Sequence, residues 1–319
     1  MRLKNIDSIK GLLIVLVIIG HILLGGENEE VWSVIIYSFH MPLFVGISGY
    51  LFKVSNVVDF NLLELLRKYL LRLILPWSIA VLAYYSFSIA QNTDRNIIHG
   101  LVSSFLFPFY HLWFIPSFLS WVILTWFLKK LKTSDRLLLF IAFFISLVSI
   151  LLKWYPESYQ DFGTLKSGIT LIQNKYRPYF YFFFILGLAY RNIQLNKPTF
   201  SEYMLPFLGF IAVVTLYYFP NNPLSIFNFF LMNAVLLLVL MKLSSNKIIP
   251  RNKTLEWLGF NSLGIYLWHL FPILICKSVI GIENSLMFYL AAICSEVIFI
   301  IGYNYLLKFD FLRKYAFGL

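Results

Sequence analysis

The first hydrophobic segment of the chain reads KGLLIVLVIIGHILLG over residues 10–25. Its length is close to the roughly 20 apolar residues that cross a bilayer as a helix. Further apolar runs follow at residues 31–52, 69–90, 112–128, 137–154, 178–190, 203–219, 224–241, 260–281 and 286–307. We therefore predict an all-α integral membrane protein with about ten transmembrane helices, built as a single domain over residues 1–319.

The composition excludes an ordinary soluble protein. Of the 319 residues, 60% are hydrophobic and 13% are charged, whereas soluble domains have about 45–50% and about 25%. The net charge of +11 is then better explained by membrane topology than by nucleic acid, so we predict no nucleic-acid partner. Cys276 and Cys294 lie within apolar runs, and no spacing of His, Cys and acidic residues is typical of a metal site, so we predict no metal.

The basic residues predict the orientation. Ten spans place both termini on one side, and most Lys and Arg residues then fall on segments of that same side. Because cytoplasmic loops are enriched in Lys and Arg, we expect both termini in the cytoplasm and the protein in the bacterial cytoplasmic membrane.

Three connecting segments are long. Residues 91–111 and 155–177 are expected on the outer side, the first as a re-entrant segment with His99 in a solvated loop. On the inner side, the segment from Asn61 to Pro76 begins as an amphipathic helix. Its charged residues share one predicted stripe, namely Glu64, Arg67, Lys68 and Arg72.

Ionisable side chains within the spans are candidates for function because they are costly in a membrane. Lys10 and His21 lie 11 residues apart in the first span, which corresponds to about 16.5 Å of helix and about 20° past three full turns. The two side chains are therefore expected on one helix face. In the second span, His40 directly precedes a segment that Pro42 is expected to kink. The alternative for each histidine is a structural hydrogen bond to a neighbouring helix.

Several short motifs follow one another along the chain. The stretch from Ile6 to His21 contains Asp, two residues, a basic residue and Gly, then an apolar run that ends in Gly-His. This stretch resembles the opening of the acyltransferase-3 family of integral membrane acyltransferases. The family's later signatures are similar to Phe39–Tyr50, Arg72–Trp77, His111–Phe114 and Asn261–His269.

The resemblance implies transfer of an acyl group, usually acetyl from acetyl-CoA, to a hydroxyl of an envelope polysaccharide or a lipid-linked sugar. The family residues most tied to activity match Lys10 and His21. The family more often has Arg where Lys10 stands, and Lys keeps the charge but not the bidentate geometry. The family also often has a second Arg at the position of Tyr69. We expect a member without the extracytoplasmic esterase-like domain that some relatives have.

The chemistry of the residues agrees with an acyltransferase. Polyanionic acetyl-CoA needs cations at the inner mouth, and we expect Lys10, Arg67, Lys68 and Arg72 to bind it. The alternative is that these cations do not bind the donor but follow from the cytoplasmic position of the segment and contact the phosphates of membrane lipids. A hydroxyl acceptor needs a base, and His21 serves either as a general base or as an acyl carrier. An oxyanion donor is expected from His40, Ser48 or Tyr266.

Other polar and aromatic residues are predicted to line the acceptor site or to lie at the membrane interface. The predicted acceptor site contains Ser48, His111, Trp113, Tyr266 and His269. The aromatic residues of the outer face are expected mainly in the interfacial belt, with sugar stacking as the alternative; they are Tyr110, Trp113, Trp154 and Tyr155. Glu296 is the only acid deep in a span, and a hydrogen bond to a hydroxyl is expected for it.

Two other functions stay open at this point. One is a flippase or transporter for a lipid-linked saccharide, which the lack of paired charges and of a repeat disfavours. The other is a haem protein with His21 and His40 as axial ligands. The identity of the acceptor, the acyl chain and the formation of a homo-oligomer also stay open.

Overall fold

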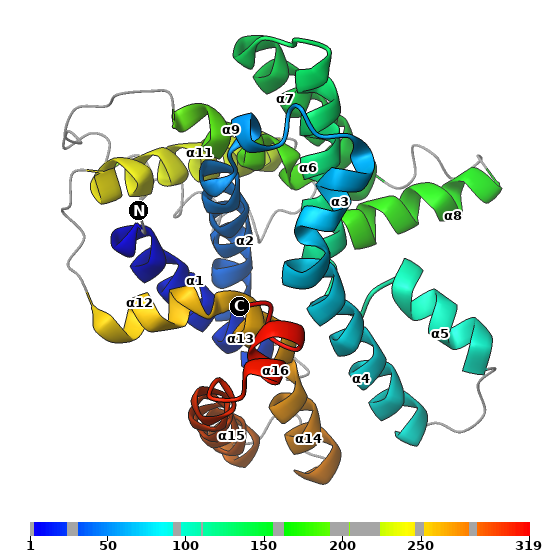
Figure 1. Cartoon of the computed structure of the whole chain (residues 1–319), viewed down its shortest axis with the longest axis vertical. Helices are drawn as coiled ribbons and strands as arrows, with labels where there is room; N and C mark the ends of the chain where they lie inside the picture. The colour runs from blue at the N-terminus through cyan, green and yellow to red at the C-terminus, as the bar shows by residue number, and fades with distance from the viewer. Residues whose placement is uncertain are drawn as a thin grey trace.

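The structure is a computed structural model that describes residues 3–23, 31–91, 97–109, 111–155, 163–191, 204, 224–245, 252–280 and 286–319. Over these residues the chain forms helices joined by turns, without a β-strand (Figure 1). The all-α prediction is therefore confirmed for the part of the chain that the structure describes.

The elements of the first half alternate long helices with short ones. In chain order they are α1 Lys4–Leu23, α2 Val31–Leu51, a 3-10 turn Val54–Asn56, α3 Leu62–Tyr69, a π-helical turn Leu70–Ile74, α4 Leu75–Gln91, α5 Ile97–Leu106 and α6 Phe114–Lys130. The elements of the second half are α7 Asp135–Trp154, α8 Thr164–Leu171, a π-helical turn Ile172–Tyr176, a 3-10 turn Pro178–Phe180, α9 Tyr181–Tyr190, α11 Leu224–Ser245, α12 Lys253–Phe260, α13 Ser262–Trp268, α14 Leu270–Ile280, α15 Leu286–Leu306 and α16 Asp310–Tyr315.

Seven described helical segments are long and apolar enough to cross a membrane. They correspond to seven of the predicted spans, from Lys4–Leu23 to Leu286–Leu306. The predicted span 178–190 forms a shorter apolar helix, 112–128 forms the 17-residue α6, and 203–219 lies outside the described residues. A multi-pass membrane protein is thus supported, whereas the number ten and the cytoplasmic termini stay predictions.

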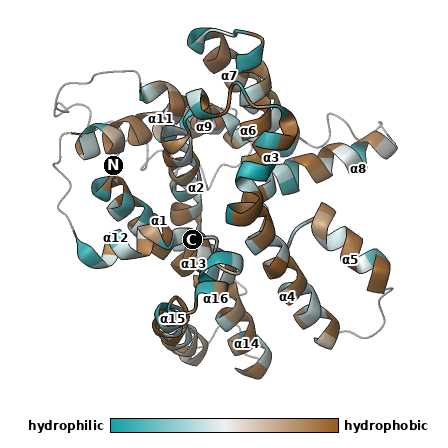
Figure 2. Ribbon diagram, in the orientation of Figure 1, coloured by the Kyte–Doolittle hydropathy of each residue, from teal (hydrophilic) through white to brown (hydrophobic). Residues whose placement is uncertain are grey.

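The outer helices present apolar side chains away from the protein. On α15 the buried side chains are Phe288, Ala292, Glu296 and Tyr303, while Ile298 and others on the same helix are exposed. Figure 2 shows the hydrophobic colour over most of α4, α14 and α15, with hydrophilic residues at α3, α16 and the start of α12. Exposed apolar helix faces are suited to contact with lipid chains rather than with water.

Two helix crossings are so close that only glycine fits. At the crossing of α1 and α12, a Cβ on Gly259 would lie 1.7 Å from the backbone oxygen of Asp7. At the crossing of α2 and α9, a Cβ on Gly187 would lie 1.8 Å from the backbone oxygen of Gly46. Small residues allow helix backbones to approach in membranes, where hydrophobic association gives little driving force. These contacts fix α1 and α2, which carry the first two predicted site histidines.

Pro42 lies inside α2, which continues through it from Val31 to Leu51. Because proline has no N–H, the carbonyl oxygen of Ser38 loses its partner within the helix. The Nδ2 atom of Asn233 on α11 donates to this oxygen at 3.0 Å. A buried amide from a neighbouring helix therefore satisfies the group that Pro42 leaves free.

The predicted amphipathic helix on the inner side begins where expected. Asn61 and Glu64 form a capping box, in which each side chain accepts from the other residue's backbone N–H. After α3, the π-helical turn Leu70–Ile74 adds a residue to the turn and rotates α4 relative to α3. Arg72 is therefore not on the uniform α-helical stripe with Arg67 that the sequence predicted.

The predicted loops and the ninth predicted span differ from expectation. His99 lies in helix α5 and not in a loop, although its side chain is exposed as predicted. Part of the predicted outer loop 155–177 forms α8 and a π-helical turn. The span predicted at 260–281 is broken at His269, between α13 and α14. Pro272 explains the break, because it removes a backbone donor and its ring clashes with the preceding turn.

Candidate active site

Three histidines from distant parts of the chain meet in one cluster. The ring centroid of His21, near the end of α1, lies 6.1 Å from that of His111 and 5.2 Å from that of His269. The rings of His111 and His269 are also 5.2 Å apart. His111 and His269 are buried, while the residue His21 is half-buried. We call these three residues the histidine cluster.

Two helices, α4 and α13, hold the segment around His111 in place. The backbone N–H of Phe114 donates to the Tyr266 hydroxyl at 3.2 Å, and that hydroxyl donates to the backbone oxygen of His111. The next carbonyl, that of Leu112, accepts from the indole of Trp77 on α4 at 3.0 Å. The segment before α6 is thus fixed from α4 and α13, and His111 takes its place in the cluster from these bonds.

The same hydroxyl makes a testable contribution to stability. Tyr266→Phe leaves a buried N–H and a buried carbonyl oxygen without their shared partner, which costs roughly 1–3 kcal/mol for each such group. We expect a clear fall in the thermal midpoint of the detergent-purified protein, whereas the exposed Tyr305→Phe serves as the control and should leave it unchanged. Equal midpoints for Tyr266→Phe and the wild type would contradict this role of the hydroxyl.

Two histidines present unpartnered nitrogen lone pairs. The Nε2 atom of His111 donates to the backbone oxygen of Leu267 at 3.3 Å, and the Nδ1 atom of His269 donates to that of Tyr266 at 2.9 Å. The opposite nitrogens, His111 Nδ1 and His269 Nε2, are buried and have no hydrogen-bond partner among the described residues. The cluster therefore has two acceptors available for a ligand when both rings are neutral.

His21 itself contacts a tyrosine of the second helix. The Tyr37 hydroxyl lies 3.4 Å from His21 Nδ1, and the Tyr37 ring packs against His40 with a centroid distance of 4.9 Å. The Nδ1 atom of His40 donates to the backbone oxygen of Ile36 at 2.5 Å. The predicted pair of histidines from the first two spans is therefore joined through Tyr37, a residue that the sequence did not single out.

A cation that the sequence did not single out lies beside the cluster. The guanidinium carbon of Arg177 is 4.1 Å from the centroid of the Trp113 ring, which is typical of a cation–π contact. Arg177 is within electrostatic reach of His21, Tyr37 and His40. Its backbone is left-handed, with φ of 44°, an uncommon conformation for a residue other than glycine. A strained residue at a functional cluster is a signal that only the structure supplies.

The contact with Arg177 bears on the predicted stacking of a sugar ring on Trp113. Its ring stacks on Phe180 at a centroid distance of 5.7 Å, in addition to the contact with Arg177, and the side chain is buried. A sugar ring would have to displace these partners before it stacked on Trp113. Of the other aromatic residues predicted for this face, Trp154 is exposed, Tyr155 is half-buried and Tyr110 lies outside the described residues.

A cavity of about 470 Å³ lies between the cluster and the Lys10 end of α1. We call it the central cavity; its polar and basic lining residues are Lys10, Ser48, Lys53, Asn56, Lys68, Tyr69, Arg72, Ser262 and Tyr266. α1 is one uninterrupted helix from Lys4 to Leu23, so the spacing of 11 residues keeps Lys10 and His21 on one helix face. Phe114 and Tyr266 also line the cavity, and the Tyr266 ring packs against that of His111.

A larger cavity of about 900 Å³ adjoins the first at Lys10, Lys53 and Arg72. We call it the entrance cavity. Its charged lining residues are Asp7, Lys10, Lys53, Arg72, Arg191, Asp310, Arg313 and Lys314. Lys10 pairs with Asp7 at 3.7 Å and Arg313 with Asp310 at 2.9 Å. The remaining excess of basic side chains makes this cavity suitable for a polyanion.

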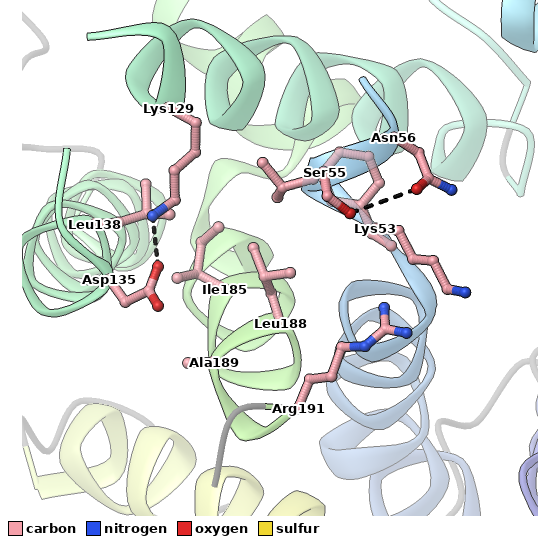
Figure 3. A pocket seen from close by; sticks show the side chains of 12 residues that line it. Lys53, Ser55, Asn56, Lys129, Asp135, Leu138, Ile185, Leu188, Ala189 and Arg191 are labelled. Carbon is pink, nitrogen blue, oxygen red and sulfur yellow. Dashed lines mark hydrogen bonds and ion pairs between the residues drawn. The ribbon is translucent and has the colours of Figure 1, made fainter. Parts of the chain in front are cut away.

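A third cavity, of about 500 Å³, shares Lys53 and Arg191 with the entrance cavity (Figure 3). We call it the side cavity. It lies between the end of α2, the junction of α6 and α7, and the end of α9. In Figure 3, Lys53 and Arg191 lie on one side of it and the paired Lys129 and Asp135 on the other, with 2.5 Å between the two charged groups of the pair.

The predicted residues for donor binding separate into two groups. Lys10, Lys68 and Arg72 line the central cavity, and Lys68 also donates to the backbone oxygen of Asn56 at 3.4 Å. Arg67 is exposed and lines none of the three cavities. Four further basic residues line the cavities, namely Lys53, Arg191, Arg313 and Lys314. In the sequence they predicted only the orientation in the membrane, because tertiary structure decides which basic residues come together.

Two further predictions concern polar groups within the spans. Ser48 lines the central cavity but donates to the backbone oxygen of Phe44 at 2.9 Å, so its hydroxyl proton is engaged. Glu296 is buried, and neither carboxyl oxygen has a hydrogen-bond partner among the described residues, so the predicted bond to a hydroxyl is not formed. No described group of three or more His, Cys, Asp and Glu side chains has the arrangement of a metal site, and the prediction of no metal stays a prediction.

The comparison with protein families agrees with this arrangement. The model of an acyltransferase domain, that of the acyltransferase-3 family, matches residues 3–305. The chain belongs to the acyltransferase-3 family. It is therefore a membrane acyltransferase, and the matched range includes α1, the histidine cluster and most of the lining of the three cavities. No curated protein and no solved structure matches the chain.

Proposed function

We propose that this acyltransferase moves an acetyl group from cytoplasmic acetyl-CoA to a hydroxyl of a cell-envelope carbohydrate or lipid-linked glycan. The observation that carries the proposal is the arrangement along α1, with basic cavities at Lys10 and the histidine cluster at His21. Basic residues gather on the cytoplasmic side of membrane proteins, so the proposal puts the entrance cavity on that side. The acceptor then approaches His21 from the opposite end of α1.

The two cavities that Lys10 lines match the two chemical parts of the donor. The entrance cavity, with its excess of basic side chains, binds the phosphates. The central cavity combines Lys10 and Arg72 with apolar side chains such as Phe44 and Phe118, which suits an uncharged pantetheine arm. The arm then extends towards Phe114 and Tyr266, whose rings must shift for the thioester to reach His21, since none of the histidines of the cluster lines the cavity.

His21 performs the proton chemistry in either of two routes. When Nδ1–H donates to the Tyr37 hydroxyl, Nε2 has a free lone pair. In the direct route, Nε2 takes the proton of the acceptor hydroxyl while the oxygen of that hydroxyl attacks the thioester carbon. The C–S bond then breaks, and the leaving thiolate takes the proton from Nε2. In the alternative route, Nε2 attacks the thioester carbon first, the C–S bond breaks and the CoA thiolate leaves. The acceptor oxygen then attacks the acyl-imidazole, the C–N bond breaks, and the proton of the hydroxyl passes through the imidazole to the thiolate.

Arg177 is proposed to stabilise the negative charge that develops during the transfer or to bind the acceptor. It is a cation beside His21 and lines none of the three cavities. We expect Arg177→Ala to lower turnover about tenfold or more, with the affinity for acyl-CoA unchanged. Arg177→Lys should retain part of the rate because it keeps the charge. Wild-type turnover in Arg177→Ala would rule out this role.

The proposed function is tested with acetyl-CoA that is radiolabelled in the acetyl group. The purified protein is expected to transfer the label to envelope glycan, or to hydrolyse acetyl-CoA slowly when no acceptor is present. A flippase would leave acetyl-CoA intact and would move a fluorescent lipid-linked saccharide across vesicles instead. A Soret absorption band in the purified protein would favour the haem alternative.

A further inference from the structure

The side cavity differs from the other two cavities in its lining. Its floor is apolar and comes from neighbouring helices, with Leu138 on α7 and Ile185 and Leu188 on α9. Two cations, Lys53 and Arg191, stand at one side of it. Both cations also line the entrance cavity, so an anion that they bind is within reach of a molecule lying there.

The cations that line the side cavity differ in whether they form an ion pair. The Lys129 ammonium is bound by the Asp135 carboxylate at 2.5 Å and by the backbone oxygen of Thr133 at 3.0 Å. No ion pair to Lys53 or Arg191 is present among the described residues. The net positive charge of the cavity therefore comes from Lys53 and Arg191, next to the entrance cavity.

The rim carries oxygen acceptors, with Asn56 near Lys53 and Asp135 on the other side (Figure 3). Asn56 has a side-chain carbonyl oxygen, which also accepts from the Ser55 hydroxyl at 3.4 Å, and Asp135 has a second carboxylate oxygen besides the one that binds Lys129. An apolar floor, two cations and acceptors at the rim match a purine with a phosphate, because a purine has flat apolar faces and an exocyclic amine. A volume of about 500 Å³ lies within the range of small-ligand sites.

We propose that the side cavity binds the adenosine 3′-phosphate end of the acyl-CoA donor, with the 3′-phosphate at Arg191 and Lys53 and the purine on the Ile185–Leu188 face of α9. This inference rests on the proposed function. The diphosphate lies in the entrance cavity and the pantetheine arm in the central cavity, and the shared Lys53 is where the three parts of the donor meet.

The test compares CoA with 3′-dephospho-CoA, which differ by the phosphate that Arg191 is proposed to bind. Binding of each is measured by calorimetry on the full chain in nanodiscs of neutral phosphatidylcholine. We expect the wild type to bind CoA about tenfold more tightly than 3′-dephospho-CoA, as one charge-assisted contact predicts. Arg191→Ala should narrow this preference, because the affinity for CoA falls more than that for 3′-dephospho-CoA while Lys53 still contacts the 3′-phosphate.

Arg136→Ala is the matched control, because Arg136 is exposed at the start of α7 and lines none of the three cavities. It should keep the wild-type preference for CoA. An Arg191→Ala variant that keeps the preference, or that loses affinity for both molecules equally, would overturn the assignment of the side cavity alone. A wild type that binds neither molecule would overturn the proposed function as well.

A second arm distinguishes the nucleotide from an anionic lipid headgroup. The measurement is repeated in nanodiscs that contain phosphatidylglycerol at matched ionic strength. The difference between the wild type and Arg191→Ala should persist there, because the nucleotide occupies the cavity. Disappearance of that difference would show that a lipid headgroup fills the side cavity, and the proposal would be overturned.

Discussion

His21→Ala is expected to reduce acyl transfer to background while CoA still binds. General base catalysis contributes about 10²–10⁴-fold, and loss of an acyl carrier would remove the route entirely. The effect should be confined to turnover, because His21 lies at the end of α1 opposite to Lys10 and lines none of the three cavities. The measurement is transfer of labelled acetyl, with CoA affinity measured by calorimetry on the same sample.

The neighbouring histidine provides the control. His40 is buried, donates to the backbone oxygen of Ile36 and packs against Tyr37, whose hydroxyl lies next to His21. We expect His40→Gln to reduce turnover less than His21→Ala does, since a glutamine can keep the bond to the Ile36 carbonyl. Turnover near that of the wild type in His21→Ala would contradict the catalytic assignment of His21.

Gly259→Ala is expected to destabilise the protein far more than a methyl group added at an open helix position. The added Cβ would lie 1.7 Å from the backbone oxygen of Asp7 and 2.8 Å from the backbone nitrogen of Gly11, so α12 must move away from α1. Overpacking typically costs about 1–3 kcal/mol, and a backbone atom cannot move aside as a flexible side chain does. We expect the thermal midpoint to fall by about 5 °C or more. Because Asp7 pairs with Lys10, acyl-CoA affinity should fall as well.

Gly302→Ala makes the same chemical change where there is room for it. Gly302 lies inside α15, and a Cβ there would meet nothing within 4 Å. Since Ala is favoured over Gly in helices by about 0.8–1.0 kcal/mol, the midpoint should stay the same or rise slightly. A Gly259→Ala variant as stable as Gly302→Ala would show that the α1–α12 crossing is looser than the structure has it.

The sequence predicted the helical class because a long apolar run in a membrane must satisfy its backbone hydrogen bonds internally, which a helix does. It placed the ends of most elements within a few residues, as for the Asn61 cap, where local side-chain chemistry sets the helix start. It did not predict the π-helical turn around Arg72 or the break at His269, because both depend on tertiary packing and on how Pro272 is accommodated. A constant helical period across residues 61–76 therefore placed Arg72 on one stripe with Arg67, whereas of these two only Arg72 lines a cavity.

The candidate site was predictable only where its residues share one helix. Lys10 and His21 could be aligned by helical geometry, because α1 is one uninterrupted helix from Lys4 to Leu23. The meeting of His111 and His269 with His21 joins segments far apart in the chain, and no local pattern encodes it. Arg177 and Arg191 were counted only as charges, because their positions beside the cluster and the side cavity depend on how α9 packs.

The most direct test of the proposed donor path is a cryo-electron microscopy structure of the full chain with a thioether analogue of acetyl-CoA, which cannot be cleaved. We predict the diphosphate in the entrance cavity near Lys10, the pantetheine arm in the central cavity, and the acyl group next to the ring of His21, with Phe114 or Tyr266 displaced. An analogue bound with its acyl group away from His21, or with its phosphates at the Arg177 end, would contradict the proposed path.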